Sequence, residues 1–151
     1  MKLISILVFT VLLTASASYA QGKFGLGIMV GEPTGLSMKY KISGDNAIDG
    51  ALGWSFAKYG SLHIHADYLQ NVARLSREVP FYLGVGGRIK TNNTNKGEND
   101  SRFGIRVPFG IVYEPSTVPI DVFVEVVPLL DLTPSSDFSM NAAVGIRYYF
   151  N

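Results

Sequence analysis

Apolar and polar side chains alternate along almost the whole chain after residue 20. Near the C-terminal end, Met140, Val144 and Ile146 fall on one side of an extended strand, whereas Asn141 and Arg147 fall on the other. No segment after residue 20 shows the apolar spacing of three to four residues that an amphipathic helix requires. The alternation predicts strands at residues 22–31, 34–42, 46–56, 61–70, 80–90, 102–113, 119–130 and 138–150.

The connections between these strands are short and rich in Pro, Gly, Asp and Ser, except for two longer ones at 70–79 and 91–101. Short connections favour antiparallel neighbours, and strands of about 9 to 11 residues are long enough to cross a membrane at a tilt. The sequence therefore predicts an all-β fold, an eight-stranded antiparallel up-and-down transmembrane β-barrel.

The aromatic residues of the apolar face occur near the ends of the predicted strands. In a barrel that starts at the periplasm they form two girdles at different heights, an arrangement typical of membrane barrels. A soluble lipocalin-like barrel would need a hydrated outer face, but the second face here is mostly glycine with scattered charges. The predicted girdle residues are Tyr40, Trp54, Phe56, Tyr68, Phe81, Phe103, Tyr113, Phe138, Tyr148 and Phe150.

Residues 1–20 follow a different pattern. Lys2 precedes an apolar run that ends at Leu13, and small residues lead to Ala20, as in a cleaved secretory signal peptide. The apolar run is shorter than the roughly 20 residues of a membrane helix. We expect cleavage after Ala20 and a barrel domain at 21–151. Export does not bring disulfides here, because the chain has no cysteine.

Charge excludes one class of partner. The chain has 13 basic and 12 acidic side chains, and Lys2 is the only charged residue among the first 20. The expected mature protein therefore has equal numbers of basic and acidic side chains and a net charge of about zero. Nucleic-acid binding normally needs an excess of basic side chains, so we expect no nucleic-acid partner. We also expect no cofactor. The expected partners are outer-membrane lipid, the assembly machinery during biogenesis and, on the cell surface, a protein ligand yet to be identified.

Several segments carry a family resemblance, namely 31–36, 47–56, 80–88 and the terminal strand 145–150. They resemble the small bacterial outer-membrane β-barrels of the OmpA and OmpX type, and a family of short outer-membrane barrels without an assigned function. The resemblance implies location in the bacterial cell outer membrane and brings no catalytic residues with it. One departure is that Asn151 follows Phe150, whereas such chains usually end on the aromatic residue.

Charged residues on the second face form the main candidate site. Glu125 lies on the strand between those of Arg106 and Arg147, so we expect it to link the two arginines. Paired charges would plug a narrow lumen, and the alternative is a narrow pore for ions or small solutes. The predicted lumen network comprises Lys39, Asp49, Asp67, Arg88, Arg106, Glu125 and Arg147.

The spacing of His63, His65 and Asp67 puts all three on one face of a strand, which makes them a weak candidate for a metal site. A hydrogen-bond network inside the lumen is the favoured interpretation. A lipid-modifying enzyme is only a minor alternative. The inward serines Ser37, Ser55 and Ser139 have no evident catalytic base, which a serine nucleophile requires. We therefore expect a non-enzymatic barrel with a structural or surface-interaction role.

Overall fold

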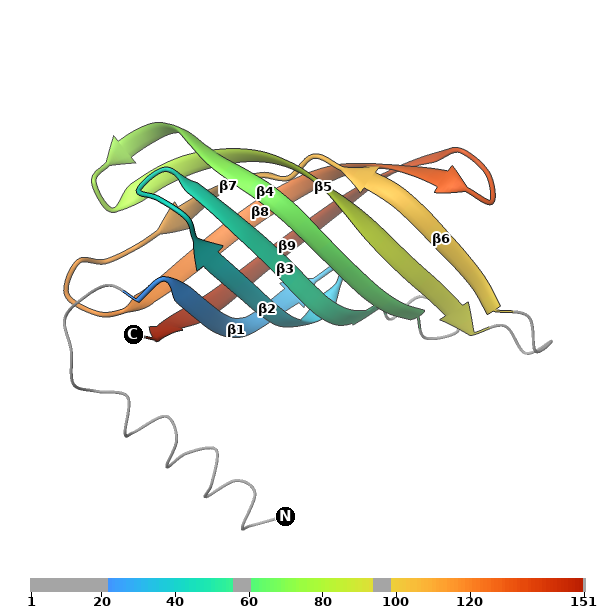
Figure 1. The fold of residues 1–151 in the computed structure, drawn as a ribbon, viewed down its shortest axis with the longest axis horizontal. Helices are drawn as coiled ribbons and strands as arrows, with labels where there is room; N and C mark the ends of the chain where they lie inside the picture. The colour runs from blue at the N-terminus through green and yellow to red at the C-terminus, as the bar shows by residue number, and fades with distance from the viewer. Residues whose placement is uncertain (1–21, 56–60, 94–98, 151) are drawn as a thin grey trace, which may run out of the picture.

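Every strand is hydrogen-bonded to a neighbour on each side, so the sheet closes on itself as a barrel (Figure 1). The computed structural model describes residues 22–55, 61–93 and 99–150. All pairings are antiparallel, and the ring closes where β4 pairs with β5. The strands are β1 (Phe24–Gly31), β2 (Thr34–Lys41), β3 (Asn46–Ser55), β4 (Ser61–Ser76), β5 (Val79–Asn93), β6 (Asn99–Arg106), β7 (Phe109–Tyr113), β8 (Ile120–Thr133) and β9 (Asp137–Phe150).

The strands β6 and β7 occupy a single position in the ring, because both lie between β5 and β8. They are separated at Pro108, which has no N–H to donate to the sheet. The carbonyl of Pro108 accepts a hydrogen bond from the Gly84 N–H at 2.8 Å, and Val107 N–H donates to Pro128 O at 3.1 Å. The prediction of eight antiparallel strand positions around the barrel is confirmed. The predicted strand at 102–113 is interrupted by proline.

The predicted connection at 70–79 is wrong. There β4 continues to Ser76 and turns at once into β5, and β-bulges lie between Asn71 and Ala73 and between Arg74 and Ser76. The first bulge reverses the alternation of the strand, because the extra residue shifts each following side chain to the other face. The other long connection, 91–101, is also shortened, since β5 runs to Asn93 and β6 begins at Asn99.

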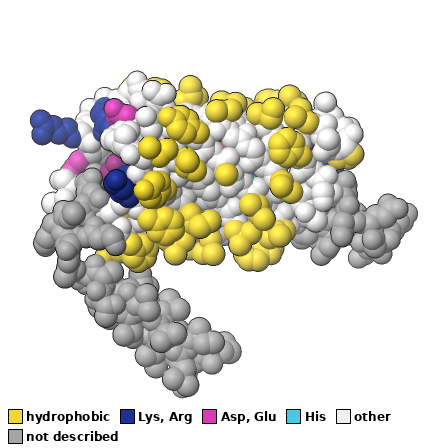
Figure 2. Space-filling model, in the orientation of Figure 1, with side chains coloured by type: hydrophobic (Ala, Val, Ile, Leu, Met, Phe, Trp, Pro, Cys, Tyr) yellow, Lys and Arg dark blue, Asp and Glu magenta, His cyan; other side chains and the backbone are white. Residues whose placement is uncertain are grey.

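The apolar face of the sheet is turned outward. Val122 and Val124, on β8, have 36% and 51% of their surface exposed. Glu125, the residue after Val124, points to the other face of the strand and is buried. Figure 2 shows hydrophobic side chains over the outer wall, with Lys, Arg, Asp and Glu gathered at one end of the barrel. A soluble barrel would have the opposite arrangement.

The register brings aromatic side chains to the same height. Phe24 at the start of β1 lies between Tyr40 on β2 and Phe150 on β9. The rings of Tyr148 and Phe150 meet edge to face at 5.1 Å. Tyr40, Trp54, Tyr68, Phe103, Tyr113 and Phe138 are exposed, while Phe81, Tyr148 and Phe150 are half-buried. The predicted girdle residue Phe56 lies outside the described residues.

The pairing of Phe24 with Phe150 also places the start of β1 and the end of β9 at one end of the barrel (Figure 1). We call the opening at this end the terminal mouth. The predicted signal peptide lies outside the described residues. Among those described, no helix is long and apolar enough to cross a membrane.

Candidate functional site: the charged lumen and the terminal mouth

Glycines on the inward face make room for large side chains inside the barrel. A Cβ at Gly25 would lie 2.9 Å from the Tyr149 ring, and one at Gly110 would lie 2.6 Å from the Tyr82 hydroxyl. Gly145 faces the Phe123 ring in the same way. An eight-stranded barrel is just wide enough for side chains to fill it. The glycine positions therefore determine where the bulky lumen groups fit.

Buried charges occupy this interior. All are at most 7% exposed, and an isolated charge at such a site is strongly unfavourable unless it is paired. Asp121 and Asp131 belong to the set although sequence reasoning missed them. The buried charged residues are the cations Lys39, Arg88, Arg106 and Arg147 and the anions Asp49, Asp67, Asp121, Glu125 and Asp131.

Arg147 is the centre of the cluster nearest the terminal mouth. Its Nε donates to Asp121 Oδ1 at 2.9 Å, and its Nη1 lies 3.7 Å from Asp49 Oδ2. The Tyr149 hydroxyl donates to Asp121 Oδ2 at 2.5 Å. The guanidinium also lies over the Phe123 ring, 4.1 Å from its centroid. One arginine thus contacts two carboxylates from different strands.

The predicted bridge from Glu125 to Arg147 is wrong. The register of β8 against β9 pairs Asp121 with Arg147, whereas Glu125 lies opposite Ala143. Glu125 has other partners: Arg106 Nη2 lies 3.5 Å from its Oε1, and the Tyr82 hydroxyl donates to Oε2 at 2.9 Å. The expected pair of Glu125 with Arg106 is therefore present, whereas Arg147 pairs with Asp121 in place of Glu125.

The weak metal candidate at His63, His65 and Asp67 is not supported. His63 Nε2 and His65 Nδ1 share a hydrogen bond at 3.1 Å, and Arg106 Nε lies 2.8 Å from Asp67 Oδ2. A guanidinium beside the carboxylate opposes the binding of another cation. Among the described residues, no group of three or more His, Cys, Asp or Glu side chains is placed to hold a metal ion.

Arg88 forms the pair at the other end of the lumen. Its Nη2 donates to Asp131 Oδ2 at 2.7 Å and its Nε donates to Oδ1 at 3.1 Å. Such a bidentate pair holds both side chains in fixed orientation. The charged side chains therefore pair inside the lumen at its two ends and in the middle.

An ion pair crosses the terminal mouth. Lys41 Nζ on β2 lies 3.2 Å from Glu114 Oε1, which follows the last residue of β7. These two strands are on opposite sides of the ring. Lys41 also lies 4.3 Å from the Tyr149 ring centroid, a cation–π distance. The mouth is thus bridged from wall to wall above the Arg147 cluster.

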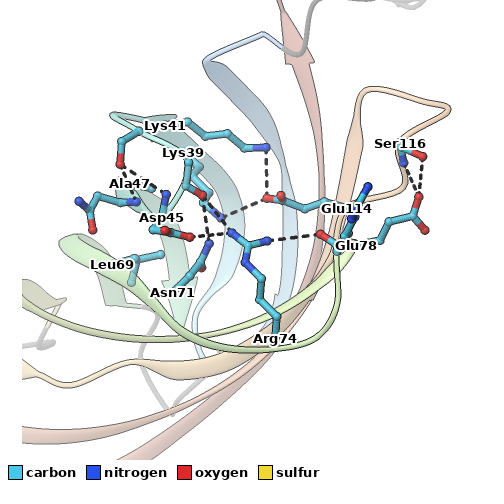
Figure 3. Close-up of a pocket in the computed structure, with 14 residues that line it drawn as sticks. Lys39, Lys41, Asp45, Ala47, Leu69, Asn71, Arg74, Glu78, Glu114 and Ser116 are labelled. Atoms are coloured by element: carbon cyan, nitrogen blue, oxygen red, sulfur yellow. Dashed lines mark hydrogen bonds and ion pairs between the residues drawn. The ribbon is translucent and has the colours of Figure 1, made fainter.

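A polar pocket of about 340 Å³ lies at the same mouth, between the β2–β3 turn and the β4–β5 hairpin (Figure 3). Arg74 Nη2 contacts Asp45 Oδ1 at 2.7 Å, which joins the hairpin to the turn. At the hairpin tip, Glu78 Oε1 accepts hydrogen bonds from the Ser116 hydroxyl and N–H at 2.6 and 2.8 Å. These bonds stabilise the carboxylate, so they lower the pKa of Glu78.

A closed ring of antiparallel strands, apolar outside and charged inside, defines a small β-barrel of the outer-membrane type. The solved N-terminal β-barrel domain of Pseudomonas aeruginosa OprF has this fold, with a TM-score of 0.65 and 12% identity over 83% of this chain and 93% of that one. Neisserial surface protein A (NspA) has a TM-score of 0.55 and 17% identity, over 84% of this chain and 93% of that one.

The chain belongs to the family described as "Protein of unknown function (DUF3996)", whose model matches residues 15–151. No curated protein matches it. The solved structures confirm the resemblance to small outer-membrane barrels at the level of the fold.

Proposed function

We propose that this protein is an integral barrel of the bacterial outer membrane that acts as a closed, non-enzymatic scaffold. Its outer wall supports this, because the exposed side chains of the strands are apolar and aromatic rings lie at the strand ends. The two solved relatives are outer-membrane barrels. We place the start of the chain at the periplasmic side, as in the girdle prediction, so the terminal mouth faces the periplasm.

The packing of the lumen is the observation that supports a closed state. Arg88 and Asp131, Arg106 and Glu125, and Arg147 and Asp121 pair at successive positions along the interior. Each of these groups is at most 4% exposed. Water and ions need a continuous hydrated path, and paired buried side chains occupy the space that such a path requires.

The arrangement of serine and histidine favours a scaffold over an enzyme. A hydrolase of the serine type needs a histidine within hydrogen-bond reach of the nucleophile. In the described chain, Ser37 accepts from Arg147 Nη1 at 3.4 Å, while the two histidines bond to one another. The side chain of Ser55 and residues 56–60 and 94–98 lie outside the described part of the chain. A surface-interaction role stays a prediction.

Conductance in planar lipid bilayers tests the proposal. Purified protein, refolded and reconstituted, is expected to give no stable openings because the lumen is filled. Insertion is verified independently with a Val124→Cys variant, since the chain has no other cysteine. A polarity-sensitive dye on this outward residue should report an apolar environment. Stable single-channel openings in samples that pass this check would overturn the closed scaffold in favour of a narrow pore.

A further inference from the structure

The pocket at the terminal mouth has a wall of mixed charge. Lys39 and Lys41 from β2, Asp45 from the β2–β3 turn, Arg74 and Arg77 from the β4–β5 hairpin, and Glu78 and Glu114 line it. Its volume of about 340 Å³ lies within the range of small-molecule sites. The pattern of pairing within this wall determines what chemistry remains available to a ligand.

Each carboxylate of the wall already has a close partner. Asp45 accepts from Arg74 at 2.7 Å, Glu78 accepts from Ser116 at 2.6 Å, and Glu114 lies 3.2 Å from Lys41. Figure 3 shows Arg74 extended between Asp45 and the hairpin tip. Every carboxylate that lines the pocket therefore has a hydrogen-bond or ion-pair partner within the protein.

Two cations of the wall are held less closely. Lys39 is 5% exposed, and its Nζ lies 3.7 Å from Glu114 and 3.9 Å from Asp121, beyond hydrogen-bond distance from either. The guanidinium of Arg77 pairs with no carboxylate among the described residues. A third group, Asn46 Oδ1, is a buried acceptor without a hydrogen-bond partner. Within the described part of the chain, two cations and one acceptor therefore make no hydrogen bond to a carboxylate or other side chain, although Lys39 keeps two longer ion pairs.

From this we propose that the terminal mouth binds a small oxyanion, a phosphate or carboxylate compound with a hydroxyl or amine close to its charge. Lys39 at the floor and Arg77 at the rim would bind the anionic group, and Asn46 would accept from the ligand's donor. Arg74 lines the same pocket because the bulge after Asn71 turns it inward, and its pairing with Asp45 fixes the wall. The site lies at the open end of the lumen with Lys39 at its floor, so binding here does not require conduction.

The test uses the full mature chain in a neutral maltoside detergent, which carries no phosphate. sn-Glycerol 3-phosphate is titrated while backbone NMR shifts are followed, and glycerol serves as the uncharged match. We expect shifts localised to residues 43–47 and 74–78 with a Kd of about 1 mM, and none with glycerol. Nanodiscs containing phosphatidylglycerol form a second arm, which distinguishes a lipid headgroup from a free solute as the source of the oxyanion.

Three variants make the test specific. Arg77→Gln should weaken binding about tenfold, because it removes a charged donor at an exposed position where the fold does not depend on it. Lys23→Gln removes one positive charge from the same end of the barrel, outside the pocket wall, and should leave Kd unchanged. Lys39→Met should abolish the shifts.

Three results would overturn the proposal. The first is the absence of localised shifts in both arms at about 10 mM ligand, ten times the expected Kd. The second is equal weakening by Arg77→Gln and Lys23→Gln, which would indicate general attraction to a positive surface. The third is an equal response to glycerol. None of these results bears on conductance, so failure here leaves the closed scaffold intact.

Discussion

Two arginine–aspartate pairs in this barrel have nearly the same contact distance and opposite surroundings. Arg147 and Asp121 meet at 2.9 Å inside the lumen, where their side chains are 1% and 0% exposed. Arg74 and Asp45 meet at 2.7 Å at the terminal mouth, where they are 40% and 63% exposed. The shorter contact is the one that water surrounds.

The comparison shows that burial, and not distance, determines what each pair means for stability. Water screens the pair at the mouth, and exposed ion pairs typically contribute about 0 to 1 kcal/mol. The lumen pair has lost its hydration, so each partner depends on the other. Asp49, Tyr149 and Ser37 also contact Arg147 or its carboxylate partner. Loss of Arg147 would remove the closest positive charge from Asp121 and Asp49 and a hydrogen-bond donor from Ser37.

The largest expected effect is that of Arg147→Met. Removing this charge should lower the free energy of unfolding by about 3 to 5 kcal/mol, because buried Asp121 and Asp49 would lose their guanidinium partner and Asp121 would keep only Lys39, at 3.9 Å. The measurement is equilibrium unfolding by urea in lipid vesicles. The matched change at the mouth, Asp45→Asn, should cost about 1 kcal/mol or less. Similar losses in both variants would mean that the lumen is hydrated.

A smaller effect should follow from filling a lumen glycine. In Gly110→Ala the new methyl group would press on the Tyr82 hydroxyl and Val124 O, displacing Tyr82 from Glu125, so we expect a loss of about 1 to 3 kcal/mol. Gly44 at the mouth is the control, because a Cβ there meets nothing within 4 Å. If Gly110→Ala proves as stable as Gly44→Ala by the same unfolding assay, the interior is looser than its contacts indicate.

The smallest effect concerns a single carboxylate at the mouth. Ser116→Ala removes the hydroxyl donor to Glu78, so the pKa of Glu78 should rise toward its ordinary value of 4.5. NMR titration of the Glu78 side chain measures this directly. A depressed pKa gives stability that is present above the unfolded-state pKa and is lost as pH falls through the folded-state value. An unchanged titration in the variant would show that the backbone N–H of Ser116 alone stabilises the carboxylate.

The sequence predicted which face of each strand points outward because the alternation of apolar residues has a period of two. Counting along an up-and-down chain also predicted two heights for the girdle residues, and the register brings two of them, Tyr40 and Phe150, level with Phe24. Lys39, Arg88 and Arg106 were assigned to the lumen by the same parity, and the structure places all three there.

The partners of these charges could not be predicted, because parity does not specify register. Asp121 and Glu125 lie on the same face of β8, and only the pairing with β9 decides which of them meets Arg147. The pocket at the terminal mouth was missed for a related reason. The β-bulges that turn Arg74 inward have no simple sequence signature, and the segment has none of the expected alternation.

The pairing of β1 with β9 has a consequence for how the barrel forms. Phe24 and Phe150 are neighbours in the sheet although almost the entire barrel sequence separates them. Until these two strands meet, each has an edge of unpaired N–H and C=O groups, which hydrocarbon cannot solvate. Contacts between such distant parts of a chain form slowly, because a long loop must close first. Closure is therefore the step at which folding and membrane insertion have to coincide.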